Sequence, residues 1–350
     1  MQQAYERQAH TLLGVRGKHI VTIGGGTGPF ALLSTLKRHD CSITAIVTMA
    51  DSGGSSRRLM DEFGTLPVGD LRQALVALSR KGILWREVFT HRFGHNGKSG
   101  RSGNGEQTSL SGHSLGNLII AALQEVNHGN LLHAIEDAQQ LLDTAGAVLP
   151  VTLSPATLCA ELENGEVIVS ETNIDTRGER TTGPLSPIKR IYLEQAAPAC
   201  EDALRAIRRA DVIVIGPGSL YTSILANFVV DGVADAIRAS EAQKVYVCNL
   251  MTNRGETDGF RASDFVREIH HYLGDRVDRI VAHDGAFPER LLARYAAGDQ
   301  HPVLPDVERL REMAPEVVVD SLLAVYQDTL VRHDADRLLR AIFTPAEYLL

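Results

Sequence analysis

Apolar and polar positions follow two different periods along this chain, and the clearest example lies near its start. Residues 19–23 (His-Ile-Val-Thr-Ile) form an apolar, β-branched run that is typical of a buried parallel strand. Glycines follow at 24–28, and residues 31–37 then show the period of an amphipathic helix. A second apolar run at 43–49 predicts the next strand. The segment is therefore expected to be a strand–helix–strand unit with a right-handed crossover.

The alternation of strands and helices continues through most of the chain. Two or three helices are predicted within 70–90, and a change to short alternating segments between 148 and 193 predicts a small antiparallel subregion. The remaining elements are predicted as helices at 115–125, 131–142 and 334–343 and as strands at 211–215, 244–248, 277–282 and 316–319. The pattern predicts a three-layer, Rossmann-like α/β fold with a mainly parallel sheet.

The domain organisation that this pattern favours is simple. We expect a loosely held leader at 1–17 and a single compact domain over 18–350. Residues 94–111 are rich in Gly, Ser, Asn and Arg and have no apolar period, which predicts a mobile loop.

Composition narrows the class of protein. The net charge is −8 and no Lys/Arg-rich run stands out, so nucleic acid is not expected as a partner. No apolar stretch approaches the length of a membrane span, and the N-terminus lacks the apolar core of a signal peptide. The four cysteines lie far apart and are expected to be reduced and mostly buried. These features predict a soluble cytoplasmic protein.

Four polar loops follow predicted strands, at 24–28, 51–57, 216–223 and 249–258. In open α/β sheets, ligands bind outside the carboxyl ends of the strands. Glycines let backbone N–H groups converge, and a following helix N-terminus favours negative charge. The recurrence of such loops predicts a site for an anionic, nucleotide-like ligand. NAD is only weakly indicated, because Pro29 stands where the dinucleotide fingerprint needs its last glycine.

Several polar residues near these loops allow two interpretations. Asp51 ends the second strand, where it could bind ribose hydroxyls or cap the next helix. Asp70 is expected to be a helix N-cap, and Arg72 could bind phosphate in bidentate fashion. Residues 112–116 match the hydrolase motif G-x-S-x-G, but no buried strand precedes them. Ser114 is therefore interpreted as a helix cap or a phosphate ligand.

Metal chemistry has little support in the sequence. Glu256, Asp258 and Asp264 are expected to be solvated loop carboxylates, with a divalent ion that bridges a bound diphosphate as the alternative. The histidines do not show the H-E-x-x-H spacing of a zinc site. The 216–223 loop lacks the Gly-Lys-Ser/Thr of a P-loop, so ATP hydrolysis of that type is not expected.

Taken together, the motifs resemble those of the YvcK-like gluconeogenesis factors of the CofD-like superfamily. The matching segments run in family order from about residue 18 to the end: 24–28 (GGGTG), 50–56 (ADSGGSS), 69–72 (GDLR), 112–118 (GHSLGNL), 216–224 (GPGSLYTSI), 249–252 (NLMT) and 255–259 (GETDG). Tyr295 and Arg332 match positions that the family associates with a UDP-sugar. An aromatic ring suits a uracil or a sugar, and a guanidinium suits a diphosphate.

The resemblance implies a Rossmann-like fold and a cytoplasmic regulator that binds a nucleotide sugar, either UDP-glucose or UDP-N-acetylglucosamine. It also implies a role in cell morphology and peptidoglycan homeostasis during gluconeogenic growth. No cofactor is required beyond the bound UDP-sugar, and Mg²⁺ is unsupported because Ser52 stands where a second acid would follow Asp51. No catalytic or metal-binding residue is assigned, and the expected ligand-binding residues are Gly25, Gly26, Thr27, Gly28, Asp51, Gly53, Gly54, Ser55, Asp70, Arg72, His113, Ser114, Asn117, Gly216, Gly218, Ser219, Thr222, Ser223, Asn249, Thr252, Tyr295 and Arg332.

Two other functions stay open at this point. The related CofD branch transfers 2-phospholactate from a guanosine diphosphate carrier to a deazaflavin, and such a transferase would need a divalent ion held by acids such as Asp51 or Asp258. An NAD-dependent oxidoreductase is the third possibility, against which Pro29 counts. A homo-oligomer and regulatory protein partners are compatible with all three functions.

Overall fold

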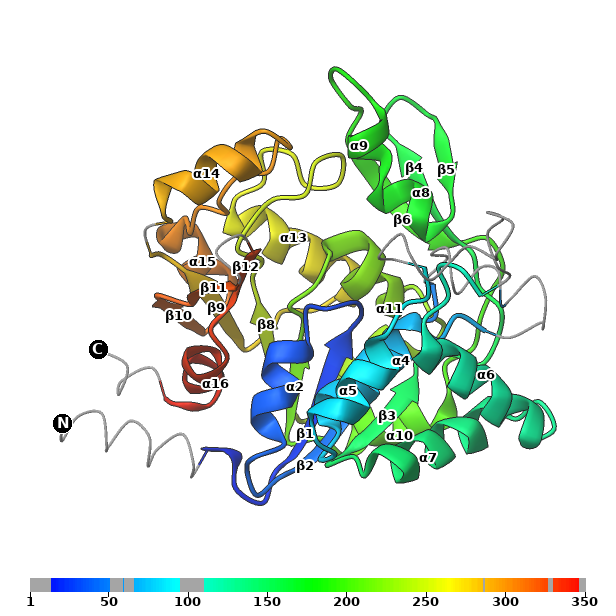
Figure 1. Ribbon diagram of the computed structural model, residues 1–350. Coiled ribbons are helices and arrows are strands. Elements are labelled where there is room, and N and C mark those ends of the chain that lie inside the picture. Colours follow the sequence, from blue (N-terminus) through cyan, green and yellow to red (C-terminus); the bar gives the residue numbers. More distant parts are fainter. Residues whose placement is uncertain are drawn as a thin grey trace.

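A seven-stranded sheet forms the centre of the protein (Figure 1). The computed structural model describes residues 14–50, 59, 66–94, 110–285, 287–326 and 330–345. The strand order is β10-β9-β8-β7-β1-β2-β3, and every neighbouring pair is parallel. The strands are His19–Gly24 (β1), Ser42–Val47 (β2), Ala147–Pro150 (β3), Val212–Ile215 (β7), Gln243–Val247 (β8), Arg279–His283 (β9) and Glu316–Asp320 (β10).

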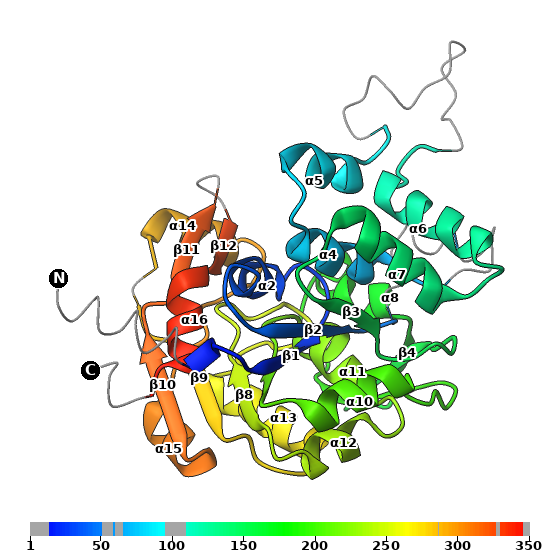
Figure 2. The same cartoon turned by 90° about the horizontal axis from the view of Figure 1, so that it is seen from below.

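Helices cover both faces of this sheet, as the two views show (Figures 1 and 2). One layer contains Phe30–Leu36 (α2), Gly69–Leu78 (α4), Ile83–Thr90 (α5), Leu115–Val126 (α6), Leu131–Leu142 (α7) and Ala335–Phe343 (α16). The other contains Glu201–Arg209 (α10), the π-helix Leu220–Leu225, Ala226–Phe228 (α11), Val233–Ala239 (α12), Ala262–Leu273 (α13) and Val307–Met313 (α15). The expected three-layer α/β fold is confirmed.

The core lies between the sheet and these two layers. In the central strand β1, the side chains of Ile20, Val21 and Ile23 are completely buried. Burial on both faces explains why such strands are continuous apolar runs in the sequence. All four cysteines are free, and three of them are buried. None of the helices in the described part of the chain is long and apolar enough to cross a membrane.

A separate antiparallel sheet flanks the main one, with the order β5-β4-β6. It contains Leu158–Leu162 (β4), Val167–Val169 (β5) and Ile188–Leu193 (β6), with Glu171–Asp175 (α8) and Arg177–Arg180 (α9) between the last two strands. The predicted subregion therefore begins too early, because Ala147–Pro150 pairs in parallel with β2 as an edge of the main sheet.

Three elements near the C-terminus were not predicted. The helix Glu289–Ala296 (α14) lies close to an antiparallel hairpin formed by Leu323–Tyr326 (β11) and Leu330–His333 (β12). Met251, Tyr295 and Leu323 pack together with Leu291 and Val331, so the hairpin and α14 share a small apolar cluster of their own.

The predicted leader and loop fall largely outside the described residues. Residues 1–13 lie outside them, but Val15 is completely buried and Gly14 lies against the backbone of Phe343. The last residues of the predicted leader are thus packed against the domain. Residues 95–109, which make up most of the predicted mobile loop, also lie outside the described part of the chain.

Candidate functional site

The strand order changes direction between β1 and β7. From β1 the chain adds β2 and β3 on one side, and from β7 it adds β8, β9 and β10 on the other. Two loops therefore leave neighbouring parallel strands and diverge, which opens a crevice at the carboxyl edge of the sheet. The loops are the glycine run 24–28 after β1 and residues 216–219 after β7. This crevice is the expected place for a ligand in a doubly wound sheet.

The two glycine loops lie so close together that side chains would not fit between them. A Cβ on Gly28 would lie 2.2 Å from the carbonyl oxygen of Pro217 and 2.8 Å from the Cα of Gly218. Gly26 and Gly216 have φ values of +62° and +81°, which favour glycine. Glycine is therefore needed in these loops for two reasons: the loops approach each other too closely for a side chain, and their backbone adopts positive φ values.

Asparagine side chains connect the loops. Asn249, directly after β8, donates from Nδ2 to the carbonyl oxygen of Gly218 at 2.8 Å. Asn227 donates from Nδ2 to the carbonyl oxygens of Gly24 at 3.3 Å and Ser223 at 2.8 Å. Three strand-end loops are thus held together by amide hydrogen bonds, which positions their backbone groups in advance of ligand binding.

A single cleft of about 1450 Å³ opens above these loops. This volume exceeds the 300–1,000 Å³ or so that is typical of a pocket for one small molecule. The cleft brings together twelve of the expected ligand-binding residues: Gly25, Gly26, Thr27, Gly28, Gly218, Ser219, Thr222, Ser223, Asn249, Thr252, Tyr295 and Arg332. Four others, Asp51, Gly53, Gly54 and Ser55, lie outside the described residues.

Tyr295 and Arg332 reach the cleft from its far side. Tyr295 is on α14, and its hydroxyl accepts a hydrogen bond from the backbone N–H of Val331 at 2.9 Å. Arg332 is on β12 and donates from Nη1 to the carbonyl oxygen of Val331, also at 2.9 Å. The hairpin therefore holds the aromatic ring and supplies the guanidinium beside it.

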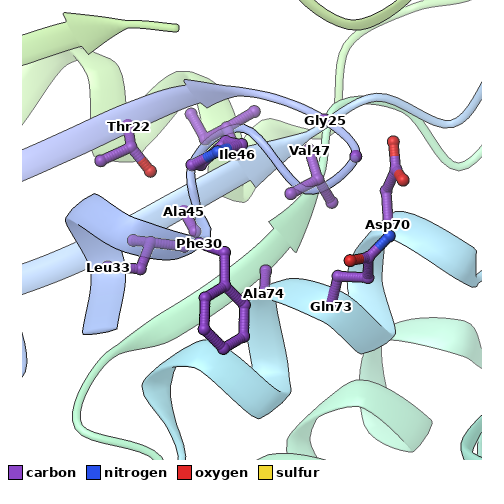
Figure 3. Close-up of a pocket in the computed structure, with 12 residues that line it drawn as sticks. Thr22, Gly25, Phe30, Leu33, Ala45, Ile46, Val47, Asp70, Gln73 and Ala74 are labelled. Atoms are coloured by element: carbon purple, nitrogen blue, oxygen red, sulfur yellow. The ribbon is translucent and has the colours of Figure 1, made fainter. Parts of the chain in front are cut away.

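Asp70 occupies a different position from the one expected. The N-cap of α4 is Val68, so Asp70 lies within the first turn and is not the cap. A Cβ on Gly25 would lie 2.5 Å from Oδ2 of Asp70, so the carboxylate packs directly against the first glycine loop. Figure 3 shows this carboxylate beside Gly25, in a small pocket next to the main cleft. The N-cap prediction is wrong because the helix begins at Gly69.

Arg72 and Asn117 form a buried cluster outside the lining of the main cleft. Arg72 donates from Nε to Oδ1 of Asn117 at 2.8 Å and from Nη1 to the carbonyl oxygen of Phe89 at 3.3 Å. Ser114 caps α6, since its side chain accepts from the N–H of Asn117, and this confirms the cap interpretation. His113, which precedes Ser114 in the sequence, is also buried. These contacts connect α4, α5 and α6.

Gly216, another of the expected ligand-binding residues, does not line the cleft. Its positive φ value shapes the loop after β7.

The cleft also contains residues that the sequence did not indicate. Glu171 and Asp175 of α8 line it, and so do Arg38, just after α2, and Arg86 of α5. Tyr326 of the hairpin is also part of the lining. The sequence contained one signal for the residues on α2. The spacing of Ala31, Ser34, Thr35 and Arg38 places them on one face of this helix and of the turn that follows it.

Glu256 is not the solvated carboxylate that the sequence suggests. It is only 4% exposed, and burial together with the neighbouring Asp175 charge raises the pKa of Glu256 to about 8. Asn253 donates from Nδ2 to its Oε1. Asp258 and Asp264 accept backbone hydrogen bonds from Gly255 and Arg261. A carboxyl group in this environment stays protonated at neutral pH.

The stability of the protein should depend on this carboxyl group. Its pKa is about 8 when folded and roughly 4.3 when unfolded, so the folded state binds more protons between these values. The free energy of unfolding therefore falls as the pH rises through this range. The Glu256→Gln variant should lose this dependence. The difference in free energy of unfolding, variant minus wild type, should therefore increase with pH. The increase should reach up to about 1.4 kcal/mol per pH unit between pH 6 and 8. Urea unfolding at three pH values measures it, and a constant difference would contradict the assignment.

No group of three or more His, Cys, Asp and Glu side chains with the geometry of a metal site occurs among the described residues. The parts of the chain that the structure does not describe include Asp51, which the transferase hypothesis uses.

Comparison with known proteins identifies the class that this fold and crevice define. Residues 20–323 match the family model described as 2-phospho-L-lactate transferase CofD. The gluconeogenesis factor of Halalkalibacterium halodurans is 41% identical over 94% of this chain and 96% of its own length. The gluconeogenesis factor of Bacillus subtilis is 40% identical over 91% and 95%, respectively.

Solved structures agree with these relatives. A crystal structure of a Bacillus halodurans protein superposes with a TM-score of 0.84 at 40% identity, covering 93% of this chain and 99% of that one. The chain therefore belongs to the YvcK-like gluconeogenesis factors within the CofD-like superfamily.

Proposed function

We propose that this protein binds a nucleotide sugar, UDP-glucose or UDP-N-acetylglucosamine, in the crevice between β1 and β7 and acts as a regulator. The observation that carries the proposal is that both glycine loops, Tyr295 and Arg332 line one cleft. The names of its relatives support a role linked to gluconeogenesis. A role in cell shape and peptidoglycan homeostasis, implied by the family resemblance, is part of the same proposal.

The chemistry of the cleft suits the parts of such a ligand. Backbone N–H groups of the glycine loops and the hydroxyls of Ser219, Thr222 and Ser223 are donors for a diphosphate. The Arg332 guanidinium adds a positive charge that can bind phosphate oxygens in bidentate fashion. The ring of Tyr295 offers a flat apolar face to a uracil or a sugar.

The direct test is calorimetric titration with UDP-N-acetylglucosamine, UDP-glucose, GDP and NAD. The proposal predicts that a UDP-sugar binds more tightly than GDP or NAD. Tight binding of GDP or NAD, with neither UDP-sugar bound, would overturn it.

Variants on the far side of the cleft test how the ligand is held. Tyr295→Ala and Arg332→Ala should each weaken UDP-sugar binding by roughly tenfold or more, the loss expected for an aromatic or charged contact. Tyr295→Phe keeps the ring and loses only the bond from the Val331 N–H, so its affinity should stay within about threefold of the wild type. Equal losses in the Phe and Ala variants would argue against stacking on the ring.

A transferase acting at a diphosphate is the second candidate, favoured by the description of the matching family model. It predicts that, with Mg²⁺, an acceptor hydroxyl attacks the phosphorus that carries the transferred group, so that the phosphoanhydride bond breaks and the nucleoside monophosphate leaves. Phosphorus NMR of a UDP-sugar incubated with the protein, Mg²⁺ and an acceptor alcohol separates the two functions, because a transferase releases UMP and a regulator leaves the UDP-sugar intact. In the transferase, Asp51→Asn should abolish turnover and leave the fold intact.

A further inference from the structure

Beyond the glycine loops, the cleft continues along one face of α2. Helix α2 lies between α5 and the β11–β12 hairpin (Figure 2), and all three elements line the same cleft. We name this part the α2 arm and define it by the residues Ala31, Ser34, Thr35 and Arg38 of or just after α2 and Arg86 and Thr90 of α5. None of these residues belongs to the nucleotide-sugar site proposed above.

The acidic residues of the cleft come from one part of its lining. Its acidic lining residues, Glu171, Asp175 and Glu179, all come from α8 and α9. The α2 arm instead contributes Arg38 and Arg86. Arg254 also lines the cleft, but it donates to the carbonyl oxygen of Gly178 on α9 and pairs with Asp299. The α2 arm contributes no lining carboxylate, so an anion is favoured there.

Arg86 is oriented by an aromatic ring. Its guanidinium carbon lies 4.7 Å from the centre of the Phe30 ring, which is a cation–π arrangement. Among the described residues, no carboxylate lies at ion-pair distance from this guanidinium, and Arg86 lines the cleft. Phe30 follows the first glycine loop directly, so the cation stands close to the point where the ligand crevice begins.

Arg38 has a partner that a ligand could replace. Its Nη2 lies 2.9 Å from Oδ1 of Asp336, and the two side chains are 58% and 67% exposed. An ion pair this exposed is weak, because water screens both charges. A phosphate or carboxylate group in the α2 arm could take the place of Asp336 at little cost.

Two neighbouring groups indicate uncompensated positive charge and a free donor. Burial, and then the charges of Arg86 and Arg38, lower the pKa of Lys37. The Oγ of Ser34 is buried and has no hydrogen-bond partner in the described part of the chain, although Ser34 lines the cleft. An anion bound here would satisfy this hydroxyl and offset the repulsion among the three cations.

We propose that the α2 arm binds a second anionic ligand, a small molecule that carries a phosphate or carboxylate group, beside the nucleotide sugar. Arg86 and Arg38 bind the anionic group, and the Ser34 hydroxyl donates to it. The cleft of about 1450 Å³ has room for two ligands. This inference goes beyond the proposed function, because it assigns a second binding site in the same cleft.

Inorganic pyrophosphate is the probe for this site. The protein is first saturated with UDP-N-acetylglucosamine, which occupies the glycine loops, and pyrophosphate is then titrated calorimetrically at constant ionic strength. Pyrophosphate should bind the saturated protein. The double variant Arg38→Ala/Arg86→Ala should bind it at least about tenfold more weakly while UDP-N-acetylglucosamine affinity changes less than about threefold. Trp85, the single tryptophan of the chain, precedes Arg86 and reports binding locally by its fluorescence.

The matched control is Arg208→Ala. Arg208 is an exposed arginine of α10 that pairs with Glu201 and does not line the cleft, so pyrophosphate binding should be unchanged. The inference is overturned if pyrophosphate fails to bind the saturated protein or binds the double variant as tightly as the wild type. If no UDP-sugar binds, the proposed function fails, and the α2 arm is then tested by titrating pyrophosphate into the ligand-free protein.

In that titration, two pyrophosphate sites in the wild type and one in the double variant support the α2 arm. Equal numbers of sites in the two proteins overturn it.

Discussion

Replacing Gly28 with alanine is expected to weaken nucleotide-sugar binding strongly. The added Cβ would lie 2.2 Å from the carbonyl oxygen of Pro217 and 2.7 Å from its carbonyl carbon. These are backbone atoms, so no side-chain rotation relieves the contact, and the two glycine loops must move apart. We expect the affinity to fall by about 100-fold, or roughly 2.7 kcal/mol. The free energy of unfolding should fall by about 1–3 kcal/mol, as in other overpacked sites.

Gly82→Ala is the matched control for this substitution. Gly82 precedes α5 with φ near −64°, and a Cβ built there meets no atom within 4 Å. Affinity should therefore be unchanged. Stability should fall by less than about 1 kcal/mol, because Gly82 is the N-cap of α5 and Ala caps a helix less well than Gly. Calorimetric titration and urea unfolding measure both quantities. If Gly28→Ala bound a UDP-sugar as the wild type does, the contact between the two loops would not form a wall of the ligand site.

Arg279→Ala is expected to cause a large loss of stability without touching the cleft. Arg279 is only 4% exposed, and its Nη2 lies 2.6 Å from Oε2 of Glu316 on the neighbouring strand. Its Nη1 donates to the carbonyl oxygens of Ala341, Ile342 and Thr344 at the end of α16, where a cation is also favoured by the helix dipole. Truncation leaves these carbonyls and the carboxylate without their donor. The Glu316 side chain is 40% exposed and water can solvate its carboxylate, so the loss comes mainly from the buried carbonyls of Ala341 and Ile342. Each buried acceptor left unsatisfied costs about 1–3 kcal/mol.

An exposed pair provides the comparison. Arg311 pairs with Glu308 at 3.0 Å, and the two side chains are 64% and 89% exposed. Arg311→Ala should therefore change the free energy of unfolding by less than about 1 kcal/mol. Urea unfolding of both variants tests the difference, and similar small losses would show that Arg279 does not anchor α16. Ligand affinity should be unchanged in both.

The strands were predictable from the sequence, but their order was not. Val212–Ile215 is a continuous apolar run because both of its faces are buried, and this signal is local. The pairing of Ile20 with Val212 joins residues far apart in the chain, and the same apolar run would suit any central position in the sheet. The crevice between β1 and β7 follows from that order. The sequence therefore predicted the loops without showing which two lie side by side.

The remaining errors concern contacts between distant segments. The hairpin was missed because Leu323–Tyr326 is short and half-exposed, so its alternation is weak. Glu256 lies in a Gly-Glu-Thr-Asp-Gly segment that is typical of a solvated loop, and one cause of its raised pKa is the charge of Asp175, which is distant in the sequence. Tyr295 and Arg332 were found through the family resemblance, because no periodicity in the sequence distinguishes them from other surface residues.

A crystal structure of the protein with UDP-N-acetylglucosamine tests the central claim most directly. The claim predicts a diphosphate within hydrogen-bond distance of the backbone N–H groups of 26–28 and 218–219, in the crevice between β1 and β7. Arg332 should contact that diphosphate, and the ring of Tyr295 should lie against the uracil or the sugar. A diphosphate bound away from both glycine loops, with Tyr295 and Arg332 out of contact with the ligand, would contradict the claim.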